Sequence, residues 1–369
     1  MTQSMTYAGS GVNYGGGLDA YKRKALEAGK RTAHHLLRLG AEEVVQSRGE
    51  SAYVWRGGEG WGRAEVNEGL GTKNRVADAA LWALGRSCYD SIAQDTVAMI
   101  INDLATMGAA PAVIMQHLAV QGSDWFKSPH GDALIEGWEK ACHTSRVSWG
   151  GGETPALWDM VPPDTVILSG SATGIIRKER HSLCEERIKP GDVIVLVGSS
   201  GIHANGLSLA RKIASRLPTS FGAKLSDGRS YGEHLLDPTV IYAPLIEECL
   251  TVGLDLHYAA HISGHGFRKL MRPTRPFRYV VEKLPTPQEV FDFIMKTGPV
   301  DLREAYGNLN MGAGFAVYLS RGCEEHLIEI AETLGLKAWV AGSIEPAEKS
   351  SVVLVEKDIV FEAEELEVR

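Results

Sequence analysis

The sequence predicts two consecutive α+β domains, and three observations lead to this fold class. The chain has 369 residues, 44% of them hydrophobic, which is long for one core and sufficient for two. Both halves mix expected strands with expected helices. A charged segment at 177–189, followed by Pro190-Gly191-Asp192, separates the two halves. We therefore expect domains at 1–176 and 177–369.

The first half begins with a glycine-rich stretch at 9–17, which we expect to be mobile. Apolar spacing and capping residues then predict helices, with Asp19 and Asp95 as N-caps of the first two. Alternating and continuous apolar runs predict strands, and Gly57 to Gly62 is typical of a turn. The expected helices are 19–39, 95–107 and 132–145, and the expected strands are 112–120, 147–149 and 165–176.

The second half restarts with a strand, a glycine-rich turn and a helix. Its expected strands are 193–197, 278–281, 314–319, 339–344 and 352–355. Its expected helices are 207–216, 239–251, 288–296 and 324–334.

Composition excludes several classes of protein. A net charge of −8 argues against a general nucleic-acid binder, which needs a basic surface. The five cysteines are odd in number and form no Cys-x-x-Cys, as expected of a reduced cytoplasmic protein. The N-terminus does not resemble a signal peptide, and no apolar run approaches a membrane span. We expect no membrane partner.

Two segments carry the first candidates for chemistry. In Glu68-Gly69-Leu70-Gly71-Thr72-Lys73, the glycines permit close backbone approach to a ligand, and the lysine could reach a phosphate. A polar turn explains this segment equally well. The expected helix 95–107 carries Asp95, Asn102 and Asp103 in an otherwise apolar sequence. Because an unpaired buried carboxylate is costly, these residues favour a metal such as Mg²⁺ or a basic partner.

Three further segments are glycine-rich or histidine-rich. Gly150-Gly151-Gly152-Glu153-Thr154 is expected to be a flexible turn ending in a carboxylate, or a simple turn. Gly198–Gly206, which contains Ser200, His203 and Asn205, lies before a helix and could hold a phosphate. His257, His261 and His265 are spaced by four, but intervening glycines argue against a helical zinc site and favour a loop that contacts substrate.

Taken together, these segments resemble the aminoimidazole ribonucleotide (AIR) synthetase family, also called phosphoribosylformylglycinamidine cyclo-ligases. Seven short matches occur in the family's order along nearly the whole chain. They are Tyr7–Asn13, Glu68–Lys73, Asp95–Asp103 with Gly108–Pro111, Gly151–Thr154, Gly198–Gly206, His261–Phe267 and Asn310–Gly314.

The resemblance implies a homodimer in which the N-terminal halves pair their sheets into a central barrel, with a C-terminal α/β layer domain. It also implies a reaction in purine biosynthesis. ATP phosphorylates the formyl oxygen of formylglycinamidine ribonucleotide, and an internal nitrogen then closes the imidazole ring.

The resemblance also assigns roles to individual residues. It implies Mg²⁺ ligands at Glu68, Asp95, Asp103 and Glu153. Lys73 neutralises phosphate charge and, with Asp95 and His203, forms the catalytic set. Nucleotide contacts are expected at Gly69, Gly71, Thr72, Lys73, Asn102, Gly151 and Gly152. Substrate contacts are expected at Ser200, His203, Asn205, His261 and Ser263.

The chain departs from the family pattern at Glu68 and Asn13, where the family has aspartates, and at His265, where it has a glycine. Two alternatives therefore stand beside the cyclo-ligase. One is another ATP-dependent enzyme of the superfamily, such as a selenophosphate synthetase or thiamine-monophosphate kinase, acting on a different small acceptor. The other is an inactive nucleotide-binding paralogue.

Overall fold

The computed structural model describes residues 5–6, 8–10, 18–58 and 60–366. Most of the matching segment 7–13, including Asn13, and most of the glycine-rich stretch lie outside the described residues. Within the described residues, no helix is long and apolar enough to cross a membrane.

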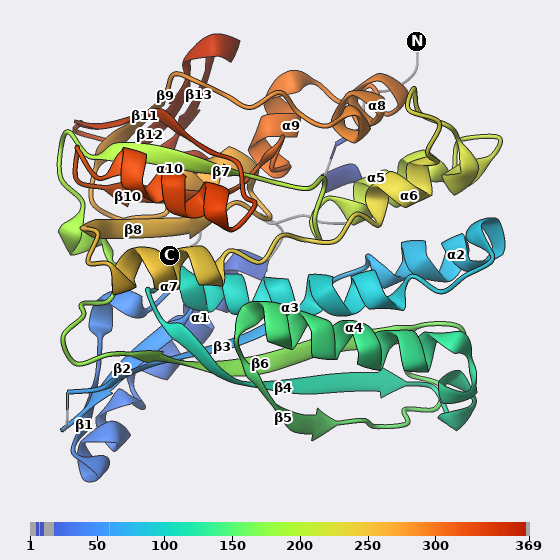
Figure 1. Cartoon of the computed structure of the whole chain (residues 1–369), viewed down its shortest axis with the longest axis horizontal. Helices are drawn as coiled ribbons and strands as arrows, with labels where there is room; N and C mark the ends of the chain where they lie inside the picture. Colours follow the sequence, from blue (N-terminus) through green and yellow to red (C-terminus); the bar gives the residue numbers. More distant parts are fainter. Residues whose placement is uncertain (1–4, 7, 11–17, 59, 367–369) are drawn as a thin grey trace.

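The first half of the chain forms a six-stranded sheet in the order β1-β2-β3-β6-β4-β5 (Figure 1). Neighbouring strands are antiparallel, except that β4 and β5 are parallel. The strands are β1 (Ala41–Glu43), β2 (Tyr53–Gly57), β3 (Gly62–Gly69), β4 (Ala110–Val120), β5 (Ser148–Glu153) and β6 (Val166–Ile176).

The second half forms a seven-stranded sheet in the order β13-β12-β9-β11-β7-β10-β8. Only the pair β9 and β12 is parallel. The strands are β7 (Val193–Gly198), β8 (Leu256–His261), β9 (Phe277–Val281), β10 (Ala313–Leu319), β11 (Ala338–Pro346), β12 (Ser351–Leu354) and β13 (Ile359–Glu362). The two expected α+β halves are therefore present, and the expected boundary falls in the connection between β6 and β7.

Ten α-helices of the described chain surround these sheets. In the first half, α3 and α4 cover one face of the six-stranded sheet and leave the other face open (Figure 1). The helices are α1 (Leu18–Lys30), α2 (Asn74–Leu84), α3 (Tyr89–Ala105), α4 (Pro129–Ser145), α5 (Leu207–Ala214), α6 (Tyr231–Leu235), α7 (Ala243–Thr251), α8 (Glu289–Thr297), α9 (Leu302–Asn308) and α10 (Glu324–Thr333).

Helix α3 is the central element of the molecule. It packs on the six-stranded sheet and α4 on one side and on α7 and β8 of the second half on the other (Figure 1). Such a helix is expected to be apolar all round. Its buried polar side chains are therefore exceptions that need partners; Thr96 bonds within the helix, whereas Asp95, Asn102 and Asp103 are bonded from outside it.

Several local expectations were wrong. Helix α3 begins at Tyr89, so Asp95 lies inside it and does not cap it, because Tyr89 and Ile92 add a further buried turn. The expected helix 19–39 divides into α1 and a 3₁₀ helix at Ala33–Leu39.

Two strands also differ from expectation. The expected flexible turn at 150–152 is part of β5, because parallel pairing with β4 supplies hydrogen bonds that local glycine content does not predict. The segment around His257 and His261 is the buried strand β8, not a loop.

A buried histidine joins the start of β7 to β8. His257 Nδ1 lies 2.7 Å from Asp192 Oδ2, and its Nε2 lies 3.0 Å from Asp255 Oδ2. Hydrogen bonding to Asp192, with a further contribution from Asp255, raises the pKa of His257 despite its burial. The folded protein therefore binds this proton more tightly than the unfolded chain.

This linkage predicts a pH-dependent contribution to stability. It is fully present below about pH 6.5, the ordinary histidine pKa, and is lost as pH rises through the raised pKa. We expect His257→Gln to flatten that part of the profile of unfolding free energy, measured by urea denaturation. His326→Gln, at an exposed residue of α10, is the control. An unchanged slope in His257→Gln would contradict the assignment.

Candidate active site

A cavity of about 450 Å³ lies where residues from both halves meet. Its wall combines carboxylates, cations and uncharged polar groups, a composition suited to a charged ligand with a bound cation. The lining residues that carry the argument are Lys22, Arg23, Glu68, Asp103, Asn205, Ser263, His265, Lys269 and Arg272.

Three carboxylates, Glu50, Glu68 and Asp103, enter from the first half, and Glu50 pairs with Arg272 at 3.4 Å. Glu68 stands near the end of β3, where its Oε1 accepts a 2.9 Å hydrogen bond from Gly69 N. Burial, reinforced by the negative charge of Asp103, raises the pKa of Glu68. Because a bound cation would offset both effects, this pair is a suitable place for one.

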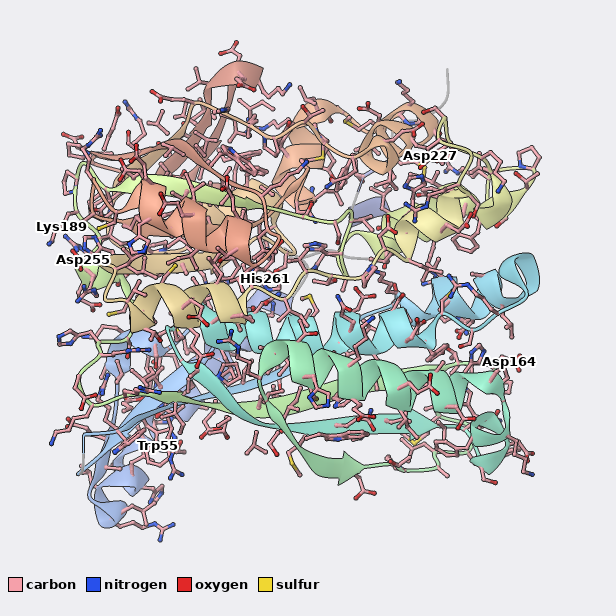
Figure 2. The ribbon with its side chains drawn as sticks, viewed as in Figure 1. Trp55, Asp164, Lys189, Asp227, Asp255 and His261 are labelled. Atoms are coloured by element: carbon pink, nitrogen blue, oxygen red, sulfur yellow. The ribbon has the colours of Figure 1, made fainter. Side chains whose placement is uncertain are left out.

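Asp103 comes from α3 and is held by the second half. His261, at the end of β8 (Figure 2), places Nδ1 3.0 Å from Asp103 Oδ1. Burial would raise the pKa of Asp103, but the His261 hydrogen bond and the charges of His261 and Lys269 outweigh it and lower that pKa. Asp103 is therefore the carboxylate that stays ionised.

Cations form the rest of the charged wall. Lys269 Nζ lies 2.8 Å from Ser263 Oγ, and burial together with the charge of Arg272 lowers the pKa of Lys269 to about 8. Arg272 is fixed by Gly49 O at 2.7 Å, and Lys22 and Arg23 of α1 face the same cavity. The arrangement can accommodate an anion beside a carboxylate-bound cation.

Of the other predicted site residues, Asn205 and Ser263 line this cavity. Asn205 lies in the glycine-rich connection between β7 and α5, and its Nδ2 is 3.9 Å from Met99 Sδ. Gly69, Gly71 and Thr72 follow the cavity residue Glu68 in the sequence, but they do not line the cavity.

Lys73 and Asp95 form a fully buried ion pair away from the cavity. Lys73 Nζ is 2.8 Å from Asp95 Oδ1, and both side chains have no exposed surface. The same oxygen accepts from Thr239 N at 2.8 Å and Thr239 Oγ1 at 2.5 Å. Lys73 also donates to Asp237 O at 2.8 Å. In this conformation the pair holds the segment 237–239, and Asp95 Oδ2 has no hydrogen-bond partner among the described residues. The phosphate and metal roles expected of Lys73 and Asp95 stay predictions.

Asn102 holds the adjoining segment in the same way. Its Nδ2 donates to Val240 O at 2.8 Å, and its Oδ1 accepts from Tyr242 N at 2.7 Å. Both polar ends of the amide are thus used within the protein. In this conformation Asn102 joins the two halves, and the nucleotide contact expected there stays a prediction.

Ser200 and His203 do not line the cavity. Ser200 Oγ donates to Pro238 O at 2.6 Å, and Ser200 N donates to His203 Nε2 at 3.2 Å. Burial, with the nearby His261 and Lys73, lowers the pKa of His203 well below its usual value, so its ring is neutral. In this conformation Ser200 holds the backbone of Pro238 and His203 holds the backbone of Ser200, as His261 holds Asp103.

The glycine-rich strand β5 lies three strands away from Glu68. Gly69, Ser169, His117 and Glu153 form one row across the sheet, on its open face. At about 4.8 Å per strand, Glu153 stands roughly 14 Å from the end of β3. Within one chain, Gly151, Gly152 and Glu153 therefore do not join Glu68 and Asp103.

Sequence reasoning missed several residues of the cavity wall. These residues are Lys22, Arg23, Met99, Lys269 and Arg272, with His265 noted only as a departure. The cations lie on helical segments and belong to no ligand-binding motif, so only their distance from the carboxylates in the folded chain identifies them.

Comparison with known proteins gives the family. The family model described as AIR synthase related protein, N-terminal domain, matches residues 49–176, and its C-terminal counterpart matches 189–355. The chain belongs to the AIR synthase related family. The resemblance found in the sequence is thereby confirmed.

Curated relatives extend over most of this AIR synthase related chain. It is 35% identical over 298 residues to the phosphoribosylformylglycinamidine cyclo-ligase of Methanococcus maripaludis strain C6, covering 78% of this chain and 81% of the relative. It is 31% identical over 363 residues to the enzyme of that name from Carboxydothermus hydrogenoformans, covering 95% and 99%.

Solved structures share the fold at low identity. Thiamine-monophosphate kinase from Stenotrophomonas maltophilia matches with a TM-score of 0.58 at 19% identity, covering 90% of this chain and 97% of that one. Phosphoribosylformylglycinamidine synthase II from Thermotoga maritima matches with a TM-score of 0.55 at 17% identity, covering 92% and 49%.

The buried ion pair gives a testable prediction. We expect Lys73→Met to lower the free energy of unfolding by about 3–5 kcal/mol, because it leaves Asp95 buried without its counter-charge. Lys73→Met combined with Asp95→Leu should lose less than the sum of the single changes. Urea denaturation measures both.

Arg75→Met is the matched control. Arg75 is exposed and lies 4.0 Å from Asp78, so its loss should cost about 1 kcal/mol or less. Equal losses in Lys73→Met and Arg75→Met would show that the buried pair does not hold the segment 237–239.

Proposed function

We propose that the protein is a phosphoribosylformylglycinamidine cyclo-ligase that uses ATP and Mg²⁺. The observation that carries this proposal is that curated relatives of that name span nearly the whole chain, including the segments that build the cavity. These relatives confirm the expected enzyme class. The product expected is aminoimidazole ribonucleotide, with ADP and phosphate.

The donor set fits the requirements of Mg²⁺. Glu68 and Asp103 offer carboxylate oxygens, and Mg²⁺ is usually bound by one or two carboxylates together with substrate phosphates. When bound, it would neutralise charge on the phosphates of ATP. His261 holds one oxygen of Asp103, which fixes the direction of the other.

The cationic wall accounts for binding of the anionic substrates. Lys269 and Arg272 are fixed by hydrogen bonds and stand beside the carboxylates, and Lys22 and Arg23 complete the wall from α1. Phosphoryl transfer depends mainly on positioning and charge neutralisation, and groups held in place need no rearrangement during reaction. Asn205 and Ser263 would contact the ribonucleotide.

The expected homodimer rests on the open face of the six-stranded sheet. Val113 and Met115 of β4 and Ile167 of β6 are 39%, 40% and 52% exposed on that face. Val113 and Met115 are neighbours on β4, and Ile167 lies opposite Ala119, four residues further along that strand. Exposed apolar side chains on one sheet face favour an interaction surface. Pairing two such faces into a central barrel would cover them and would bring Glu153 near the partner chain.

An assay with ATP, Mg²⁺ and formylglycinamidine ribonucleotide tests the function. We expect aminoimidazole product from the wild type and a loss of turnover by orders of magnitude in Asp103→Asn, because the ionised metal ligand is removed. Asp90→Asn, at an exposed residue in the first turn of α3, is the control. Melting curves must show that all variants fold.

ADP release without aminoimidazole product would indicate another acceptor. If the protein bound neither ATP nor Mg²⁺, both enzyme hypotheses would fail and an inactive paralogue would be the remaining interpretation. Near-normal turnover of folded Asp103→Asn would remove Asp103 from the metal site while leaving the overall activity established.

Dimerisation is tested separately by sedimentation velocity. We expect Met115→Glu with Ile167→Glu to give monomers, because each change would bury a charge in the interface. Val252→Glu, at an equally exposed valine after α7, should remain dimeric. A wild-type monomer, or a double variant that still dimerises, would contradict this interface.

A further inference from the structure

His265 has a left-handed backbone in the wall of the cavity. Its φ is +74° and its ψ is 4°, immediately before the 3₁₀ helix Gly266–Met271. For a residue with a Cβ, this conformation costs roughly 1–2 kcal/mol relative to glycine. The chain thus keeps an unfavourable side chain at a position where glycine would be relaxed. Such strain is found preferentially at functional sites.

The surroundings of the imidazole indicate what it could bind. His265 is only 9% exposed and lines the cavity together with Asn205, Ser263 and Lys269. Burial, followed by the charges of Lys269 and Arg268, lowers the pKa of His265 to about 3. The ring is therefore neutral, and a hydrogen bond to the backbone of Gly264 engages its N–H, so towards a ligand the imidazole acts as an acceptor.

A neutral ring among cations suits an uncharged polar group better than a phosphate. Lys269 and Arg272 already supply positive charge to this cavity. His265 also enters from the second half, with Asn205 and Ser263, whereas Glu68 and Asp103 enter from the first. His265 thus lies with Asn205 and Ser263, the residues that we propose contact the ribonucleotide.

We propose that His265 is a specificity-determining residue that hydrogen-bonds an uncharged polar group of the acceptor ribonucleotide, such as a hydroxyl or an amide. This proposal rests on the proposed function, because it names a contact to that substrate. It accounts for a histidine in a strained conformation, because the contact stabilises the complex and glycine could not make it.

His265→Gly is an unusually clean test, because the new residue suits the backbone better than the old one. We expect the variant to fold, with a melting temperature within about 5 °C of wild type. Its KM for the ribonucleotide should rise about three- to tenfold, the effect of losing one hydrogen bond. Its KM for ATP should stay within about twofold, since we place the contact on the acceptor.

Two further variants complete the experiment. Asp358→Gly removes a comparable left-handed strain, at φ +53°, from an exposed residue that is absent from the cavity wall, and should leave both KM values unchanged. His265→Asn keeps a donor and an acceptor in a side chain that tolerates this backbone, and should recover part of the affinity.

The outcomes separate the two proposals. If the wild type makes aminoimidazole product and His265→Gly has an unchanged KM for the ribonucleotide, the role of His265 is overturned and the proposed function stands. A KM change for ATP alone also overturns it. If the wild type neither turns over nor binds the ribonucleotide in calorimetry, the proposed function fails and the named contact fails with it.

Discussion

The buried Lys73–Asp95 pair is the interaction on which the arrangement of the two halves depends. Two opposite charges without exposed surface are stable only when their remaining hydrogen bonds are satisfied. Here the backbone of Asp237 holds Lys73, and both polar groups of Thr239 donate to Asp95 Oδ1, so all these partners come from the second half, while Asp95 Oδ2 has no hydrogen-bond partner among the described residues. The first half therefore cannot bury its own ion pair without fixing the position of a particular segment of the second.

Helix α3 links the contact between the two halves to the carboxylate in the cavity. Asn102 and Asp103 are adjacent, so their side chains differ by about 100° around the helix axis. The Asn102 side chain therefore points to the backbone at 240–242, and the Asp103 side chain points to His261 and the cavity. Since both residues sit on one buried helix, any shift of α3 that loosened the contact between the halves would also move the carboxylate.

The sequence could predict what depends on local pattern and on motif order. Apolar spacing was sufficient for strands such as β6 and β10 and for helix α4, and the ordered motifs identified the family and the carboxylates Glu68 and Asp103. It could not predict that Lys73 pairs with Asp95, because a lysine in a glycine-rich turn has the same local pattern whether it meets a phosphate or a carboxylate. The outcome depends on Thr239, which lies 144 residues beyond Asp95.

The same limit applies to charge. A net charge of −8 gives the impression of a protein that repels anionic substrates. Yet charges more than about 8 Å from a ligand are largely screened at physiological ionic strength, whereas groups in a buried wall are screened much less. Lys269 and Arg272 therefore interact more strongly with a ligand in the cavity than the exposed acidic residues elsewhere do. Their own burial is tolerable because Glu68, Asp103 and Glu50 stand close by, so the acidic residues that would hold a cation also stabilise the cations that would hold the phosphates.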